Sequence, residues 1–374
     1  SRILRAEAQR IGYNSNFTIY DETDSRSLLK SIIKTLGLSD KDYKPSTVHS
    51  IISMAKNQLV GADAFAVSNG GQSGLKGAKL KAVSQVYAAY QARCRQANAM
   101  DFDDLLVNTF RLFNENADIR NKYAERFQYI LVDEYQDTNF VQVAIVKLLT
   151  AKHQRICVVG DDYQSIYSFR GASIDNILDY QKKFDNVQVF KLERNYRSTR
   201  KIVEAANSLM KHNARQIPKD VYSEESEGAK ISYRPCYSDK EEAMVVVKEI
   251  KKLKRSQLFG YDGFAILYRT NAQSRSFEDE LRKSAIPYKI FGGLSFYQRK
   301  EIKDIIAYFR LVANPNDEEA FKRIINYPAR GIGGTTLMKI IDCASANEAS
   351  LWDVIGNAAR YNLDINKGTA AKLT

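Results

Sequence analysis

Residues 129–139 read YILVDEYQDTN, an apolar run that is followed at once by two adjacent carboxylates, Asp133 and Glu134. The run 129–132 is continuous rather than alternating, which predicts a strand that is buried on both faces of a parallel sheet. Ligands of such sheets gather at the carboxyl ends of the strands. One carboxylate there can hold Mg²⁺ beside a phosphate, and its neighbour can orient an attacking water. Taken alone, such a pair is more typical of a solvated turn.

A second apolar run, 156–159, leads into GDDYQSIYSFRGA at 160–172. This predicted strand brings further carboxylates to the same edge of the sheet, together with Gln164, whose amide can hydrogen-bond a γ-phosphate. Tyr167 and Phe169 precede Arg170, as in a base-stacking surface beside a cation. Stacking one base on an aromatic ring contributes about 1–3 kcal/mol. The alternative for both aromatic residues is a place in the core.

Two further runs, 187–192 and 264–268, also predict buried strands. The first leads into ERNYRST at 193–199, where Arg197 can grip a phosphate with its forked guanidinium. Tyr196, beside it, offers a flat face for a purine. Short apolar runs separated by helical stretches predict an α/β protein with a parallel sheet covered by helices.

The first hundred residues show helical periodicity. An apolar stripe at helical spacing, which is typical of a helix packed on a core, comprises Val83, Val86, Tyr87, Tyr90 and Cys94. The segment 61–77 contains five glycines and little apolar periodicity, which predicts a mobile loop. Asp101 is placed to cap a helix that begins at residue 102. The last eighty residues or so are again predicted to be helical, with a turn at 328–334.

Composition places the chain among globular proteins. Its 374 residues are 44% apolar and 27% charged, values that exclude a disordered or fibrous protein. It contains no run of about 18 apolar residues, so no membrane span is predicted. The four cysteines lack CxxC spacing, which fits a reduced, cytoplasmic protein without structural zinc.

The net charge of +12 favours a polyanionic partner, and nucleic acid is the first candidate. The excess is uneven, because residues 1–100 hold 14 basic and 7 acidic side chains whereas residues 101–150 hold 5 basic and 9 acidic ones. An acidic segment within a basic chain fits a metal–nucleotide site beside a nucleic-acid track. Chance clustering on a solvated surface is the alternative.

In order and spacing, these segments resemble the UvrD/PcrA/Rep type of superfamily-one DNA helicase. DEYQDTN is similar to the Walker B motif of that family, GDDYQSIYSFRGA to its third motif, and LERNYRST to its fourth. The resemblance extends over essentially the whole chain. Four more segments carry it: MDFDDLL at 100–106, AILYRTNAQSR at 265–275, GGLSFYQRKEIKDIIAYFRLVANP at 292–315, and RIINYPARGIGG at 323–334.

The resemblance implies ATP and Mg²⁺ as cofactors and assigns roles at the nucleotide. Asp133 would hold the Mg²⁺ and Glu134 would activate the hydrolytic water. Gln164 would contact the γ-phosphate and report its loss to the DNA side. Tyr196 would stack on the adenine, and Arg197 would act as an arginine finger from the facing domain.

The resemblance further implies single-stranded and partial-duplex DNA as partners, with repair or replication proteins as further candidates. Tyr167 and Phe169 would stack on single-stranded bases, and Arg170 would link the nucleotide and DNA sites. Arg269 and Asn271 resemble contacts that the second motor domain of the family makes to the single strand. The family often has Trp where this chain has Phe169, which offers a smaller stacking face.

A P-loop requires a Gly-Lys dipeptide, and the sequence contains none. We therefore expect an internal segment of a longer helicase, with incomplete RecA-like parallel-sheet motor domains of the P-loop NTPase type and helical accessory domains. The expected parts are accessory domain 1B at 1–100, the end of motor domain 1A at 101–193, the beginning of motor domain 2A at 194–295 and the start of accessory domain 2B at 296–374. We expect no ATPase activity from these residues alone, and ATP-driven 3′→5′ unwinding from the parent protein.

Two other functions remain open at this level. A nuclease could use two metals held by the carboxylates Asp133, Glu134, Asp137, Asp161 and Asp162. A DNA- or protein-binding scaffold is the non-enzymatic alternative. The turn at 328–334 resembles a phosphate-binding helix–hairpin–helix element, although such a segment is more typical of an ordinary turn between helices.

Overall fold

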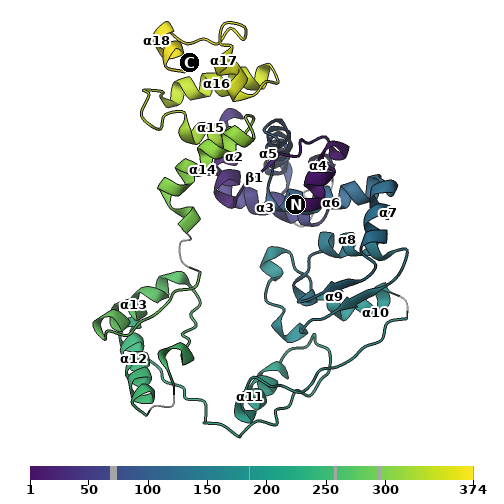
Figure 1. Cartoon of the computed structure of the whole chain (residues 1–374), viewed down its shortest axis with the longest axis vertical. Helices are drawn as coiled ribbons and strands as arrows, with labels where there is room; N and C mark the ends of the chain where they lie inside the picture. The colour runs from purple at the N-terminus through teal and green to yellow at the C-terminus, as the bar shows by residue number, and fades with distance from the viewer. Residues whose placement is uncertain (68–73, 185, 257–258, 293–295, 374) are drawn as a thin grey trace. The chain divides into compact units, whose positions relative to one another are not determined.

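The computed structural model describes residues 1–67, 74–184, 186–256, 259–292 and 296–373. These form two compact units, which are described separately (Figure 1). Unit 1 comprises Ser1–Leu192, Met210–Asp220 and Asp304–Thr374, and unit 2 comprises Glu193–Leu209 and Val221–Lys303. Among the described residues, none of the helices combines the length and the apolar character that crossing a membrane requires.

Unit 1 begins with helices that surround an apolar core. Around this core lie α2 (Glu22–Thr35), α3 (Pro45–Asn57), α4 (Ala62–Val67) and α5 (Gly77–Gln96), whereas α1 (Arg2–Ala6) packs with the next group of helices. The predicted stripe on α5 is confirmed, because all five of its residues are buried against α2, α3 and α4. The prediction of a loop over 61–77 is wrong for residues 62–67, where Phe65 anchors the short helix α4 in this core. Residues 68–73 lie outside the described part of the chain.

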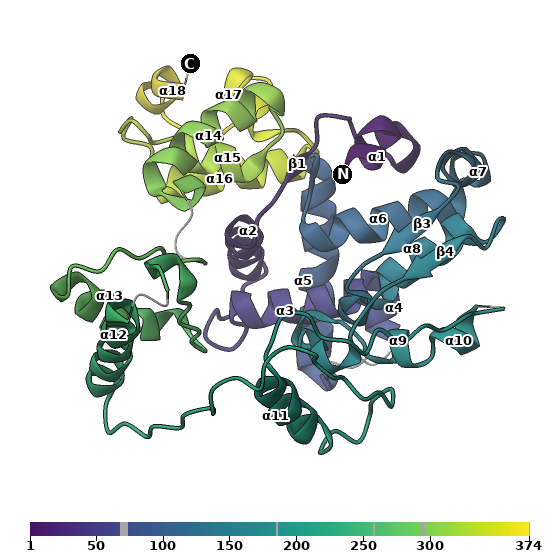
Figure 2. The same ribbon diagram turned by 60° about the horizontal axis from the view of Figure 1, so that its bottom comes forward.

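The next helices of unit 1 pack on one face of a small parallel sheet. They are α6 (Phe102–Glu115), α7 (Ala117–Arg126) and α8 (Phe140–Thr150), and α9 (Asp175–Leu178) and α10 (Tyr180–Lys183) follow the second strand. Leu112, Phe113 and Leu149 enclose Ile130 of the sheet, and residues 4–17 join the same core. Figure 2 shows α6 and α8 beside the two strands.

The described ranges contain two parallel strand pairs. In the first, β1 (Thr18–Ile19) pairs with β2 (Ala99–Met100). In the second, β3 (Ile130–Val132) pairs with β4 (Ile156–Val158), with Leu131 opposite Cys157. The parallel arrangement of the two predicted strands is therefore confirmed. Both carry their polar turns at the same edge.

The predicted burial of the strands on both faces is wrong. Val132 and Val158 face a core, whereas Leu131, the residue before Val132, points to the opposite face and is 76% exposed because the described residues cover only one face of the pair. The runs 187–192 and 264–268 form no strands either, and Leu192 and Leu267 are 86% and 94% exposed. A strand exists only where a neighbour completes its hydrogen bonds, and these runs pair with none among the described residues.

The predicted cap at Asp101 is confirmed and belongs to a buried ionic cluster. Asp101 Oδ1 accepts a hydrogen bond from the backbone N of Asp104 at 2.8 Å, and Asp104 Oδ2 accepts one from the backbone N of Asp101 at 3.2 Å. The Nζ of Lys56, at the end of α3, lies 2.6 Å from Asp101 and 2.7 Å from Asp104. Lys56 therefore neutralises the acidic start of α6 from the end of α3.

Unit 1 is completed by the carboxyl-terminal helices, as predicted. These are α14 (Lys300–Ala313), α15 (Glu318–Ile324), α16 (Gly334–Ala346), α17 (Leu351–Gly356) and α18 (Lys367–Leu373). Arg93 on α5 donates from Nε to Glu318 on α15 at 3.1 Å, and Arg310 on α14 pairs with Asp24 on α2 at 2.8 Å. The segment 325–333 connects α15 to α16 as a turn, in which the Asn326 side chain accepts from two backbone amides.

The described part of unit 2 contains the helices α11 (Arg200–Met210), α12 (Asp239–Arg255) and α13 (Ser274–Lys283). Val247 and Ile250 on α12 pack against Leu281 on α13 and against Ile286. Phe264 and Ile266 cover this core, so part of the predicted fourth strand contributes to packing without forming a strand.

Candidate functional site

The acidic turn, residues 133–137, follows β3 directly. Its backbone is tied to the end of β4, because Val159 N donates to Val132 O at 2.8 Å and Tyr135 N donates to Val159 O at 2.9 Å. Asp133 and Glu134 are both exposed, and Glu134 N donates to Asp133 Oδ1 at 2.9 Å. Glu134 adopts a φ of +48°, which is uncommon for a residue other than glycine. The turn thus holds both predicted catalytic carboxylates in solvent at the strand end.

The buried amide of Gln136 links this turn to the next one. Gln136 Nε2 donates to Glu134 Oε2 at 2.7 Å, and Gln136 Oε1 accepts from the backbone N of Asp161 at 3.0 Å. The contact requires Gly160, since a Cβ at that position would lie 2.7 Å from Gln136 Oε1 and 2.8 Å from Ile177 Cδ1. The Gly that follows β4 is therefore explained by the close approach of the two turns.

The second turn, 161–164, contains the predicted phosphate sensor. Gln164 Nε2 donates to Asp161 Oδ2 at 2.8 Å, so a hydrogen-bonded chain runs from Glu134 through Gln136 and Asp161 to Gln164. The structure thus brings Glu134 and Gln164 into one network, with Asp133 next to it. The Gln164 side chain is exposed to solvent.

Lys219 anchors this second turn. Its Nζ lies 2.6 Å from Asp161 Oδ1 and 2.6 Å from Asp162 Oδ1, and 3.8 Å from the centre of the Tyr163 ring. Partial burial alone would raise the pKa of Asp161, but hydrogen bonds from Lys219 and Gln164 outweigh it and hold that pKa below the ordinary value. Burial would lower the pKa of Lys219, and its bonds to the two carboxylates raise it instead. Lys219 therefore stays charged and holds the turn in place.

The aromatic turn, 167–170, follows in the same unit. Phe169 is 75% exposed and Tyr167 is 37% exposed, so the core alternative is wrong for Phe169. The two ring centroids lie 5.9 Å apart with 32° between the ring planes. The guanidinium of Arg170 lies 5.3 Å from the Tyr167 ring centre and 5.5 Å from that of Phe169. This is an open aromatic platform with a cation at its side, a combination suited to bases and phosphates.

In unit 2, the predicted nucleotide residues follow a short backbone pairing. Asn195 N donates to Tyr222 O at 2.7 Å, and the Asn195 side chain accepts from the backbone N of Arg197 at 3.0 Å. Both Tyr196, 72% exposed, and Arg197 are open to solvent. The guanidinium of Arg194 lies 4.6 Å from the Tyr196 ring centre and covers one of its faces. A planar group could stack on the other face.

The two predicted DNA contacts of unit 2 lie at the start of α13. Arg269 and Asn271 are exposed, and Asn271 begins a single helical turn, Asn271–Gln273. Thr270, between them, donates its backbone N to Gln273 Oε1 at 2.9 Å, which fixes the turn. The structure therefore presents both side chains to solvent from one short segment.

The residues of the acidic turn fit a Mg²⁺ ion that is shared with a phosphate. An exposed carboxylate at a strand end, that of Asp133, is the kind of single ligand that Mg²⁺ uses together with phosphate oxygens and water. Desolvation and the charge of Glu134 raise the pKa of Asp137, so this carboxyl keeps its proton to a higher pH than a free aspartate. In the described ranges, no group of three or more His, Cys, Asp or Glu side chains is arranged to hold a metal ion.

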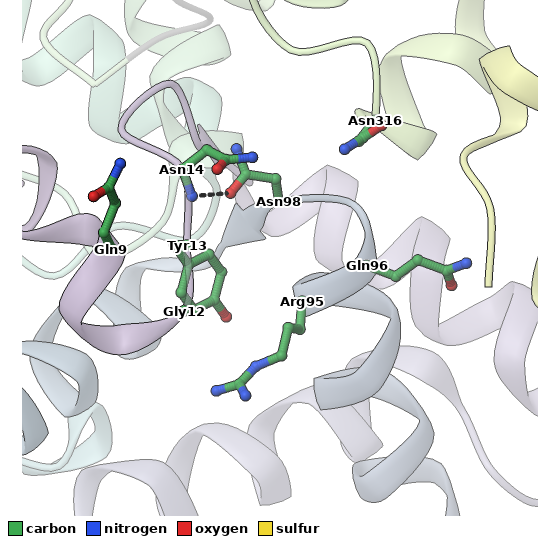
Figure 3. Close-up of a pocket in the computed structure, with 8 residues that line it drawn as sticks. All are labelled: Gln9, Gly12, Tyr13, Asn14, Arg95, Gln96, Asn98 and Asn316. Carbon is green, nitrogen blue, oxygen red and sulfur yellow. Dashed lines mark hydrogen bonds between the residues drawn. The ribbon is translucent and has the colours of Figure 1, made fainter.

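A separate polar pocket of about 280 Å³ lies in unit 1 (Figure 3). Its lining groups serve other contacts, because Asn98 Oδ1 accepts from Asn14 N at 3.0 Å and Gln96 Nε2 donates to Ala349 O at 3.0 Å. Figure 3 shows Gln9 and Arg95 pointing in different directions. The pocket is lined by none of the predicted site residues.

Sequence reasoning missed Gln136, Gly160 and Lys219 as parts of the site. Gln136 and Gly160 lie inside the two motifs, but their roles depend on the approach of the two turns. Lys219 follows β4 by some sixty residues and stands in the segment RQIPKD, which carries no motif signal. A search for basic residues to match the acidic pair Asp161 and Asp162 would have been the one way to suspect it.

Comparison with known proteins covers nearly the whole chain. The UvrD/REP helicase N-terminal domain matches residues 1–185, and the UvrD-like helicase C-terminal domain matches residues 190–369. The ATP-dependent DNA helicase PcrA of Bacillus subtilis is 45% identical over 354 residues, which are 95% of this chain and 47% of that protein. PcrA of Leuconostoc citreum is 41% identical and PcrA of Staphylococcus aureus strain Mu50 is 43% identical, over 95% and 96% of this chain and 47% and 48% of those proteins.

The chain thus spans about half the length of the curated relatives that it matches. Both matched domains are of the UvrD type, and they follow one another in the order of the motifs found in the sequence. UvrD-like domains imply the motor fold of P-loop NTPases, of which the parallel pair β3–β4 with its polar turns is a part. The chain therefore belongs to the UvrD/PcrA-type family of superfamily-one helicases.

Proposed function

We propose that the chain carries nucleotide-hydrolysis and single-strand-binding parts of an ATP-dependent DNA helicase. The whole protein would couple ATP hydrolysis to translocation along single-stranded DNA and to 3′→5′ unwinding of the duplex. The observation that carries the proposal is the hydrogen-bonded chain from Glu134 through Gln136 and Asp161 to Gln164. It joins a group suited to activating water to a group suited to sensing a phosphate, in a chain whose relatives are ATP-dependent DNA helicases.

At the nucleotide, we assign Asp133 to Mg²⁺, which when bound neutralises charge on the phosphates. Glu134 accepts a proton from the attacking water, and its amide partner Gln136 keeps the carboxylate oriented. Gln164 can exchange its bond to Asp161 for one to a γ-phosphate oxygen, so that the state of the phosphate alters the second turn.

In unit 2, we assign Tyr196 to stacking on the adenine with its uncovered face. Arg197 supplies positive charge to the transferring phosphoryl group, the role in which a guanidinium is most effective. The exposure of both side chains supports these assignments. In the whole protein, Glu134→Gln should abolish hydrolysis while ATP still binds, because the amide keeps the shape but accepts no proton. Unchanged turnover would contradict the role of Glu134.

At the DNA, we assign Tyr167 and Phe169 to stacking and Arg170 to the adjoining phosphate. Arg269 and Asn271 contact the strand from unit 2. Removing both rings, in Tyr167→Ala/Phe169→Ala, should weaken binding of a labelled oligo(dT) to this chain by about 5- to 150-fold, the equivalent of roughly 1–3 kcal/mol for a stacked base. The salt slope of log Kd should stay unchanged, because no phosphate contact is lost.

The matched control is Phe309→Ala, which removes a ring of similar exposure on α14, away from the aromatic turn. Its affinity for oligo(dT) should equal that of the unaltered chain. An equal loss in the control, or no loss in the double variant, would contradict the proposed DNA site. Fluorescence anisotropy at two salt concentrations provides all of these readings.

For this chain on its own, we propose negligible ATPase activity, since its sequence holds no Gly-Lys dipeptide to form a phosphate cradle. DNA-stimulated hydrolysis by these 374 residues would contradict that. Binding of DNA without hydrolysis would leave the chain itself acting as a scaffold. We keep the predicted division at residues 100, 193 and 295 as a proposal, supported by the separate cores of residues 20–99 and 307–363.

A two-metal nuclease is the competing enzyme. It would need the carboxylates of Asp161 and Asp162 free for cations, yet the ammonium of Lys219 lies 2.6 Å from each. Gln164, moreover, has no function in such a site. Metal-dependent cleavage of single-stranded DNA in the absence of ATP would revive this alternative.

A further inference from the structure

Asn57, the last residue of α3, lies beneath the aromatic turn. Its side chain is buried, and both the nitrogen and the oxygen of its amide form hydrogen bonds. Asn57 Nδ2 donates to Ser53 O at 2.8 Å and to Asp103 Oδ1 at 3.0 Å, while Asn57 Oδ1 accepts from Asn139 Nδ2 at 2.6 Å. One side chain of an accessory helix therefore joins the start of α6 to the residue that ends the DEYQDTN segment.

Asn139 carries this connection on to the end of the aromatic turn. It caps α8 through a reciprocal pair of hydrogen bonds with Gln142, and its backbone forms an antiparallel bridge with Ala172. Gly171 rests directly on Asn57, because a Cβ there would lie 3.5 Å from Asn57 Cβ. Its φ of +83° reverses the chain immediately after Arg170.

Among the residues that the structure describes, few other contacts hold the aromatic turn at this end. Arg170 N and Ala172 N both donate to Tyr167 O, so these bonds lie within the turn and do not attach it to its surroundings. The bond from Ser173 N to Thr138 O at 3.2 Å belongs to the bridge between Asn139 and Ala172. Residues 167–172 thus depend on Asn57 and Asn139 for their position, whereas the acidic turn has its own bonds to β4.

We propose that Asn57 is a positioning residue for the aromatic turn, through which the accessory helix α3 sets the stacking surface for single-stranded DNA. The inference rests on the proposed DNA role of Tyr167 and Phe169. Stacking binds a base more tightly when the rings are already held in place, because ordering a mobile turn on binding costs conformational entropy. A buried amide suits this task, since leaving any of its partners unpaired destabilises the junction.

The test compares Asn57→Ala with the unaltered chain in binding labelled oligo(dT). Loss of one buried hydrogen-bonded amide should weaken binding about 5- to 30-fold, with an unchanged salt slope. The matched control is Asn108→Ala, a buried asparagine on α6 whose Nδ2 contacts Met100 Sδ at 3.5 Å and which touches neither turn. It should bind as the unaltered chain does.

The decisive reading is a double-mutant cycle. In the Tyr167→Ala/Phe169→Ala background, Asn57→Ala should weaken binding no further, because no stacking surface is left to position. A further loss of the same size would show a general structural effect and overturn the proposal. So would normal affinity of Asn57→Ala while the aromatic variant binds weakly. If the aromatic variant itself binds normally, the proposed DNA site fails, and this inference fails with it.

A second measurement does not depend on DNA. Amide hydrogen exchange of residues 167–172 should be faster in Asn57→Ala than in the unaltered chain, and exchange of 133–137 should be unchanged. Equal acceleration of both segments would overturn the proposal. Asn57→Ser, which keeps a small polar group, serves if the alanine variant does not fold, with a smaller effect in the same direction.

Discussion

Lys56→Met should destabilise the junction between α3 and α6 strongly. The Lys56 side chain is 1% exposed, and its Nζ lies 2.6 Å from Asp101 and 2.7 Å from Asp104. Methionine has a similar shape and no charge, so the change removes the cation without opening a large cavity. Two carboxylates, with side chains 6% and 12% exposed, would then face one another in the interior.

Breaking a buried ion pair by removing one partner costs roughly 3–5 kcal/mol. One of the two acids can relieve part of this cost by taking up a proton. Burial, followed by the charge of Asp101, already raises the pKa of Asp104 to about 7 in the presence of Lys56. Near neutral pH we therefore expect the lower end of the range, about 3 kcal/mol.

The pH dependence has a definite sign. A carboxyl group whose pKa is higher in the folded than in the unfolded protein stabilises the fold below its unfolded pKa, and that contribution is lost as the pH rises through the folded pKa. In Lys56→Met, the positive charge that lowers the pKa of Asp104 is gone, so burial and the charge of Asp101 raise that pKa further. The deficit of the variant should therefore be larger at pH 8 than at pH 5.

Amide hydrogen exchange measures the loss of stability at the α3–α6 junction itself. A local measurement is needed because the chain has two units, and a global unfolding curve would combine them. Peptides covering 45–57 and 102–115 should exchange roughly 150-fold faster, which corresponds to about 3 kcal/mol. The control is Lys152→Met, which removes an ion pair to Glu125 whose side chains are both 65% exposed, and exposed pairs contribute about 0–1 kcal/mol. A change below about fivefold, or one no larger than that of the control, would refute the reasoning.

Two more predictions concern the turns of the site. Gly160→Ala should destabilise the paired turns by roughly 1–3 kcal/mol, because the new Cβ would lie 2.7 Å from Gln136 Oε1. Faster amide hydrogen exchange of residues 130–137 would show this destabilisation. An unchanged exchange rate would contradict the close packing of the two turns. Lys219→Met should raise the pKa of Asp161, which NMR titration of its carboxyl carbon measures. In the unaltered chain, the lowered pKa of Asp161 stabilises the fold at pH values above the unfolded pKa, and this stabilisation is lost as the pH falls through the folded pKa. The variant should lack this pH-dependent part of its stability. An unchanged pKa would show that Lys219 does not hold the carboxylate.

The elements that the sequence predicted correctly are those that neighbouring residues determine. The α5 stripe follows from the helical spacing of its own residues and the Asp101 cap from a contact three positions away, and both are present. The runs 187–192 and 264–268 are apolar enough for strands, but a strand needs a partner at a distance, and no local pattern records whether one is there. The glycines of 61–77 did not prevent α4, because Phe65 finds a core.

In the candidate site, too, the residues that local sequence indicates were predicted and those that depend on distant contacts were not. Asp133, Glu134 and Gln164 could be selected because each follows an apolar run, and the structure joins Glu134 to Gln164. The connecting groups could not be selected. The bond from Asp161 to Gln136 spans 25 residues and that from Lys219 to Asp161 spans 58, and such pairings arise only when the strands are assembled.

The pairing of Arg93 with Glu318 has a consequence for biosynthesis. The two residues are 225 positions apart, and all of unit 2 is made between them. At about 5–20 residues per second, a ribosome takes roughly 11–45 s to cover that distance. During this time the amino-terminal helices have left the exit tunnel without these partners, so unit 1 completes its fold only after α15 has been made. Slowing translation between these positions should lengthen the period in which the nascent chain is open to proteases and chaperones.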